Sequence, residues 1–232
     1  MQTGWNAVYS NLRRIYIRQI PEDRKQEMGK HLKVQRIDKA GDYPKGSQCI
    51  CAVMLLRYLG MQITVDEFID NFLPQRKIKF KEGVIYGPDP NTDFAGSPYD
   101  SKSFGCYPGA IVKALNDCFL QKGMAYTAID ATGMSTKEIL AEGIDADMPV
   151  LYWVTHDLIP PVLELSWTIK GTDQKVNWYR NLHCVLMTGY EEDTLDFINP
   201  GETTVRETVS RSLAMRRHAE LGRRTVIVKK EY

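Results

Sequence analysis

Apolar positions in the first two-thirds of the chain recur three or four residues apart, which predicts helices. The clearest case begins at Ser47 and ends at Gly60, a residue type that often closes a helix. Three further helices are predicted at 64–73, 108–123 and 135–146. Two of these open on a hydroxyl residue followed three positions later by glutamate, the pattern of a capping box: Thr64 with Glu67, and Ser135 with Glu138.

The later part of the chain has strand-like patterns instead. Segment 148–156 is apolar and rich in β-branched and aromatic residues, 183–202 predicts two strands around an acidic turn, and 225–232 predicts a last strand. One earlier strand is predicted at 32–37, where apolar and polar residues alternate. Helices that precede strands favour an α+β fold, with the helix that starts at Ser47 packed on a C-terminal antiparallel sheet.

Two segments rich in turn-forming residues predict loops. The shorter, 38–46, leads directly into the helix at Ser47. The longer, 81–109, is rich in Gly, Pro, Asp and Ser, and a loop of that length in a compact domain usually binds a ligand or is disordered. Its aromatic residues argue against disorder, so we expect it to cover a cleft, unless these rings only pack within the loop. They are Tyr86, Phe94, Tyr99, Phe104 and Tyr107.

The bulk composition narrows the class of protein. Hydrophobic residues make up 43% and charged residues 25% of the 232 residues, as in soluble globular proteins. The net charge of +1 gives no reason to expect a nucleic-acid partner. No segment has the apolar length of a membrane span or a signal peptide, so we expect a soluble, cytoplasmic chain. Residues 1–31 predict a charged helical extension before a domain over 32–232.

The cysteine pattern argues against disulfides and metals. The five cysteines are Cys49, Cys51, Cys106, Cys118 and Cys184, an odd number in mostly apolar surroundings. Cys49 and Cys51 are too close in sequence for the usual zinc-ligand spacing. We therefore expect reduced thiols, no metal and no cofactor.

The start of the first helix is a candidate nucleophile position. Ser47 lies where backbone N–H groups are unpaired and the helix dipole is positive, an arrangement that stabilises a developing anion. A plain helix cap is the alternative for a serine there. Cys49 and Cys51 lie on the buried stripe of the helix, where thiols are usually inert.

His183 is the candidate base. It opens one predicted strand, and Asn199 ends the next, so an antiparallel pairing places them side by side. Asn199 would then orient the imidazole, as the third member of a nucleophile–base–orienter arrangement. The alternative is a core histidine bonded to a carbonyl. His156 follows a strand and either lines the same cleft or is solvated, and His31 and His218 lie in charged stretches that predict surface positions.

The order of these segments resembles the double-glycine-leader peptidase-like family of papain-like cysteine peptidases, in its second, non-transporter group. The resemblance begins near residue 32 and covers nearly all of the chain that follows. It rests on Pro44 and Gly46 before "AVMLLRYLG", the helix 64–68, "YGPDP" (86–90), "GCY" (105–107), the strand 149–153, "HCVLMTGY" (183–190), Asn199-Pro200 and the C-terminal "AELGRRTVIV".

The resemblance implies a peptidase site with four departures from the family pattern. The family's nucleophilic cysteine falls on Ser47, its following glutamate on Gln48, and its oxyanion-hole glutamine on Lys39. The family's aspartate of the "DP" pair falls on Asn199, a milder change. The same motifs imply that the ligand is a peptide or protein and that its contacts are Tyr86, Asp89, Tyr107 and Trp153.

Three accounts of Ser47 follow. It is an engineered replacement of a cysteine, or the chain is a natural pseudopeptidase that binds peptides, or the serine itself is the nucleophile. Serine is a much weaker nucleophile than a thiolate paired with imidazole, and the loss of one oxyanion donor costs about 3 kcal/mol. The sequence therefore predicts a peptidase-family protein whose cleavage of peptide or amide bonds is absent or strongly impaired. Acyl transfer and hydrolysis are not distinguished.

Overall fold

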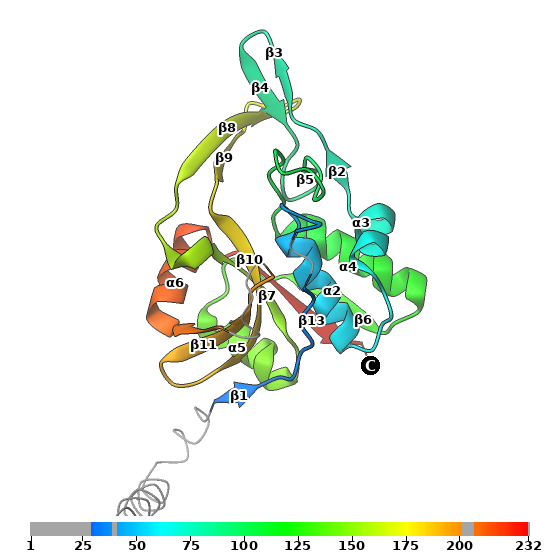
Figure 1. The fold of residues 1–232 in the computed structure, drawn as a ribbon, viewed down its shortest axis with the longest axis vertical. Coiled ribbons are helices and arrows are strands. Elements are labelled where there is room, and N and C mark those ends of the chain that lie inside the picture. Colours follow the sequence, from blue (N-terminus) through cyan, green and yellow to red (C-terminus); the bar gives the residue numbers. More distant parts are fainter. Residues whose placement is uncertain (1–28, 39–40, 201–206, 232) are drawn as a thin grey trace, which may run out of the picture.

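A central antiparallel sheet organises the chain. The structure, a computed structural model, describes residues 29–38, 41–200 and 207–231, so Lys39 and the predicted helices before residue 29 lie outside it. Within those ranges seven strands form the sheet, in the order β12-β11-β10-β7-β13-β6, with β1 paired to β10 (Figure 1). They are β1 (Lys30–His31), β6 (Tyr126–Asp130), β7 (Val150–Thr155), β10 (Leu182–Tyr190), β11 (Thr194–Ile198), β12 (Glu207–Ser210) and β13 (Thr225–Lys230).

Helices cover both faces of this sheet (Figure 1). Successive side chains of a strand point to opposite faces, so Cys184 and Leu186 join one core and Val185 and Met187 the other. The first core contains α2 (Ser47–Tyr58), α3 (Val65–Phe72) and α4 (Pro108–Lys122), and the second contains α5 (Thr136–Glu142) and α6 (Arg211–Glu220). None of the helices in the described ranges combines the length and the apolarity that a bilayer crossing needs.

A smaller sheet projects from one end of the molecule (Figure 1). Its strands run in the order β3 (Lys79–Lys81), β4 (Val84–Gly87), β8 (Leu163–Ile169) and β9 (Lys175–Tyr179), and a separate pair joins β2 (Gln75–Arg76) to β5 (Phe94–Ala95). Trp167 of β8 and Trp178 of β9 stack with ring centroids 5.8 Å apart. The expectation of one long loop over 81–109 is therefore wrong, because β4 and β5 both lie within it.

The helix predictions agree with the structure more closely than the early strand prediction. Both capping boxes are present, and Gly123 ends α4 in the left-handed region at φ 64°. The strand expected at 32–37 is wrong: no strand is assigned there, and the two-residue β1 precedes it, although the burial of residues 32–36 still alternates. Every residue of α2 from Gln48 to Leu56 is buried, so this helix lies inside the domain and is not half exposed.

Candidate active site

The start of α2 is held against the start of β10. The backbone N–H of Cys184 donates to Ser47 Oγ at 3.3 Å, and the Cys51 thiol donates to the Cys184 carbonyl at 3.5 Å. Ser47 is the first residue of α2, and His183 immediately precedes Cys184. These contacts bring the predicted nucleophile and the predicted base to one place from positions far apart in the sequence.

The turn before Ser47 requires glycine. The N–H of Gly46 donates to the Tyr43 carbonyl at 2.9 Å, which closes the turn. A β-carbon at residue 46 would lie 2.6 Å from the β-carbon of Tyr43, far inside normal contact distance. Because Gly46 is also the N-cap of α2 and has no side chain, it leaves the amide groups of the first turn free for a ligand anion.

His183 and Asn199 form the predicted pair. Their strands, β10 and β11, are antiparallel, with Leu186 opposite Ile198, so the start of one lies beside the end of the other. His183 Nε2 and Asn199 Oδ1 are 2.8 Å apart. An amide oxygen only accepts hydrogen bonds, so Nε2 is the protonated ring nitrogen and Nδ1 is left to accept a proton. Asn199 is 4% exposed, which holds this geometry away from water.

Burial controls the protonation of His183. It lowers the pKa of His183 to about 4, an effect that the bond to Asn199 opposes and the nearby His156 reinforces. The two imidazole rings meet edge to face, with centroids 5.2 Å apart. His156 Nδ1 in turn lies 3.0 Å from a carboxylate oxygen of Asp157. His183 is therefore a neutral imidazole at pH 7, the form that can accept a proton.

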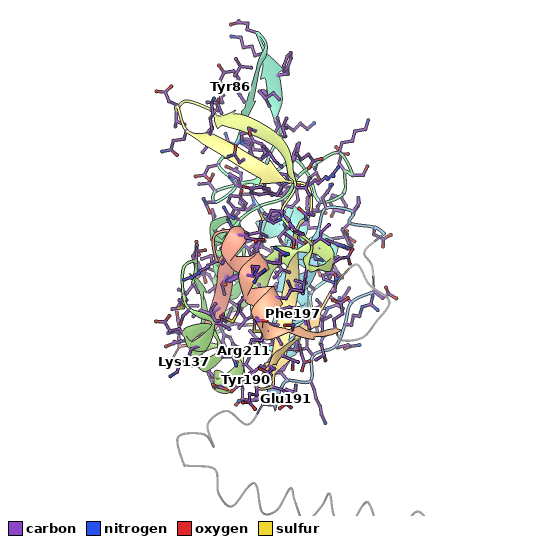
Figure 2. The ribbon with its side chains drawn as sticks, turned by 90° about the vertical axis from the view of Figure 1, so that its left-hand side faces the viewer. Tyr86, Lys137, Tyr190, Glu191, Phe197 and Arg211 are labelled. Carbon is purple, nitrogen blue, oxygen red and sulfur yellow. The ribbon has the colours of Figure 1, made fainter. Side chains whose placement is uncertain are left out.

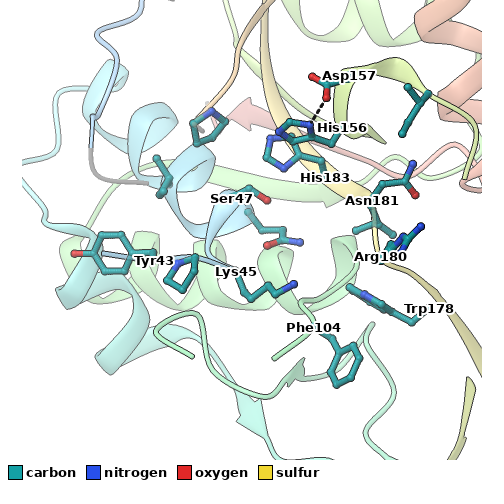
Figure 3. Close-up of a pocket in the computed structure, with 16 residues that line it drawn as sticks. Tyr43, Lys45, Ser47, Phe104, His156, Asp157, Trp178, Arg180, Asn181 and His183 are labelled. Atoms are coloured by element: carbon teal, nitrogen blue, oxygen red, sulfur yellow. Dashed lines mark ion pairs between the residues drawn. The ribbon is translucent and has the colours of Figure 1, made fainter. Parts of the chain in front are cut away.

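A pocket of about 460 Å³ opens beside these residues (Figure 3). It lies between the loop before α2, the short helix η3 (His156–Leu158) and the connection from β9 to β10. Its lining is Tyr43, Pro44, Lys45, Ser47, Gln48, Ile50, Phe104, His156, Asp157, Ile159, Trp178, Arg180, Asn181, Leu182, His183 and Pro200. Ser47 and His183 thus share one solvent-accessible space with Gln48, the residue that replaces the expected glutamate.

The four side chains expected to contact a ligand lie elsewhere. Trp153 is fully buried and donates its indole N–H to the Cys106 carbonyl at 3.1 Å, so it is a core residue, and the expectation that it contacts a ligand is wrong. Tyr107 stacks on Trp178 and carries the Arg224 guanidinium over its ring. Asp89 caps its own turn through the Asn91 amide. Tyr86 lies on β4 in the projecting sheet (Figure 2).

Two other expectations can be compared with the structure. Cys49 is fully buried, and burial raises the pKa of its thiol far above the usual value, in agreement with an inert thiol on the buried side of α2. His218 is 2% exposed, although its sequence surroundings are charged. Its ring stacks on Tyr152 and bonds to the Trp153 carbonyl at 2.9 Å, which makes it part of the second core.

The pocket also contains residues that the sequence did not single out, of which Lys45 and Arg180 contribute positive charge and Trp178 contributes aromatic surface. Phe104, one of the aromatic residues of the 81–109 segment that was expected to cover a cleft, is part of the same lining. Lys45 is one residue before the Gly46 turn, which is the only sequence signal for its position. In the described ranges no group of three or more His, Cys, Asp or Glu side chains has metal-binding geometry.

Comparisons with known proteins bear on the fold. Residues 32–223 match the sequence profile described as "Peptidase_C39 like family". A solved structure described as a "putative C39-like peptidase" from Bacillus anthracis superposes with a TM-score of 0.76 at 20% identity, over 88% of this chain and 98% of that chain. No curated protein matches. The fold is therefore the α+β papain-like peptidase fold.

Proposed function

Because the chain belongs to the Peptidase C39-like family, we propose that its pocket binds a peptide or amide and that Ser47, His183 and Asn199 occupy the nucleophile, base and orienter positions. The supporting observation is the 2.8 Å contact of His183 with Asn199 beside the first residue of α2. The proposal includes membership of the second, non-transporter group of the family. It also includes a papain-like domain over residues 32–232, preceded by an extension over 1–31.

A cysteine at position 47 would allow the complete reaction. Its proton passes to His183 Nδ1, the sulfur attacks the substrate carbonyl carbon, and the carbonyl oxygen becomes an oxyanion near the first-turn amides of α2. The intermediate then expels the amine, which takes the proton from His183. Water, activated by the same imidazole, releases the acid from the acyl-enzyme. Asn199 keeps the ring oriented throughout.

Serine at position 47 weakens the first step of this sequence. A hydroxyl is far more difficult to deprotonate than a thiol, and a base with a pKa of about 4 provides little driving force for the transfer. The Ser47 hydroxyl oxygen also accepts a hydrogen bond from the Cys184 N–H, and this bond occupies one lone pair of the oxygen. We therefore propose that this chain cleaves peptides very slowly or not at all.

A pseudopeptidase that binds peptides is the second candidate. The combination of an intact pocket of about 460 Å³ with a serine nucleophile favours it. The two candidates share the ligand and differ only in whether a bond is broken. Both predict that the pocket retains the geometry of a peptidase site.

Covalent labelling tests the shared geometry. We expect the Ser47→Cys variant to be labelled by a peptide that carries a cysteine-directed electrophile, with one adduct seen by intact mass and located at residue 47. The Ser47→Cys/His183→Ala variant should label much more slowly, because the thiol loses its base. The native chain controls for the other five cysteines, all of which are buried. Equal labelling with and without His183 would contradict the proposal.

A further inference from the structure

Two cations in the pocket have no carboxylate partner among the residues that the structure describes. Lys45 comes from the loop before α2 and Arg180 from the β9–β10 connection, so they approach the pocket from separate elements. In Figure 3 the Lys45 ammonium extends toward the side where Trp178 and Arg180 lie. The carboxylate in the pocket lining, Asp157, is paired with His156. The part of the pocket near Lys45 and Arg180 is therefore positively charged.

An aromatic wall lines the same pocket as these cations. Trp178 stacks on Tyr107 with centroids 5.5 Å apart, and Phe104 meets it edge to face at 6.1 Å. A β-carbon at Gly105, where φ is 149°, would lie 3.1 Å from the Trp178 ring, so the chain passes as close to this ring as glycine allows. The wall is therefore fixed before any ligand arrives, and because Trp178 is 3% exposed, the half-buried ring of Phe104 is its more accessible part.

Gln48 supplies an unsatisfied acceptor in the same pocket. Its residue is 2% exposed, and its Oε1 atom is buried with no hydrogen-bond partner among the described residues. A buried acceptor without a partner destabilises the site, and a ligand N–H that bonds to it would remove this cost. Peptide bonds provide such a donor, and a carboxylate is the group that Lys and Arg bind most readily.

We propose that the pocket selects a peptide with a carboxylate that lies between Lys45 and Arg180, with its apolar part on the Phe104–Trp178 wall and a backbone N–H on Gln48 Oε1. The inference rests on the proposed peptide ligand and adds the charge that this ligand carries. The carboxylate comes from an acidic side chain or from a free C-terminus. Both sources have the same chemistry, and the peptides used in the test separate them.

Peptide binding to the native chain tests the preference for a carboxylate without any catalytic step. The probes are acetylated, amidated alanine peptides with one glutamate moved through each position, their glutamine counterparts, and the all-alanine peptide with a free C-terminus. Calorimetry at low salt should show about tenfold tighter binding for one glutamate peptide, or for the free C-terminus, than for its neutral counterpart. Equal affinities across all charged and neutral pairs would overturn the inference, as would an absence of binding.

Charge changes in the protein provide the matched test. Lys45→Gln and Arg180→Gln should each remove most of the preference, and the Lys45→Glu/Arg180→Glu variant should favour lysine peptides instead. The control is Lys137→Gln, since Lys137 is an exposed residue of α5 at the opposite end of the molecule from Tyr86 (Figure 2). A preference that survives in the double variant would place the carboxylate elsewhere and overturn the inference.

Failure of the inference and failure of the proposed function give different results. If peptides bind equally whatever their charge and the Ser47→Cys variant is labelled in a His183-dependent way, the function stands and the charge selection is wrong. If no peptide binds and no such labelling occurs, both are wrong.

Discussion

The Ser47→Cys variant is expected to cleave peptide or amide substrates at least about 10³-fold faster than the native chain. A thiol in this position is at the start of α2, where amides are unpaired, and shares the pocket with His183, whose Nδ1 is the proton-accepting ring nitrogen. Both features favour the thiolate, whereas neither makes the Ser47 hydroxyl a good nucleophile. The measurement is hydrolysis of a fluorogenic peptide pool at pH 7, with rates compared at equal protein concentration.

Two further variants identify the source of this increase in cleavage rate. Ser47→Ala should match the native chain, because the native hydroxyl contributes little to cleavage. Adding His183→Ala to the Ser47→Cys variant should remove most of the gain, about 10²–10⁴-fold, as expected for a lost general base. A Ser47→Cys variant no faster than Ser47→Ala, with its fold intact, would show that the pocket only binds.

Replacement of Trp153 by alanine is expected to lower the free energy of unfolding by about 3–5 kcal/mol. The indole is fully buried in the core between the sheet and α2, so the change leaves a large cavity. It also leaves the Cys106 carbonyl without the indole N–H that it accepts at 3.1 Å. Urea unfolding monitored by circular dichroism measures the loss.

Phe80→Ala is the matched control, since Phe80 is an aromatic residue that is 74% exposed on β3. This substitution should change the free energy of unfolding by no more than about 0.5 kcal/mol, as at other surface positions. The milder Trp153→Phe change should lower stability while peptide affinity stays unchanged. Two results would instead support a ligand contact by Trp153. One is a decrease below about 1 kcal/mol in the free energy of unfolding for Trp153→Ala, and the other is a lower peptide affinity for Trp153→Phe.

The sequence predicts the parts of the site that depend on local patterns. Ser47 is found because a glycine turn precedes a long apolar run, and the capping boxes at Thr64 and Ser135 fix the starts of two other helices. His183 and Asn199 are found because two strands joined by a short turn are necessarily antiparallel. In each case residues that are close in the sequence determine the local structure.

The parts that sequence reasoning misses depend on distant contacts. Strand β9 has only two buried apolar residues, Val176 and Trp178, which is too short a pattern to distinguish from a loop. His218 lies in a charged helix whose buried face is only Ala214 and His218, so its contact with Tyr152 has no local signal. Arg180 enters the pocket only because β9 and β10 connect there.

The most direct test of the account is the protonation of His183, followed by NMR of its ring nitrogens in the native chain and in the Ser47→Cys variant. In the native chain, burial lowers the pKa of His183 to about 4, so the ring should stay neutral from pH 7 down to that value. In the variant, a thiolate at residue 47 favours the charged ring, so the pKa of His183 should rise and the imidazolium should be present at pH 7. His31 and His218, whose rings do not contact His183, serve as internal controls. A His183 that titrates identically in both proteins would contradict the pairing of residue 47 with this imidazole.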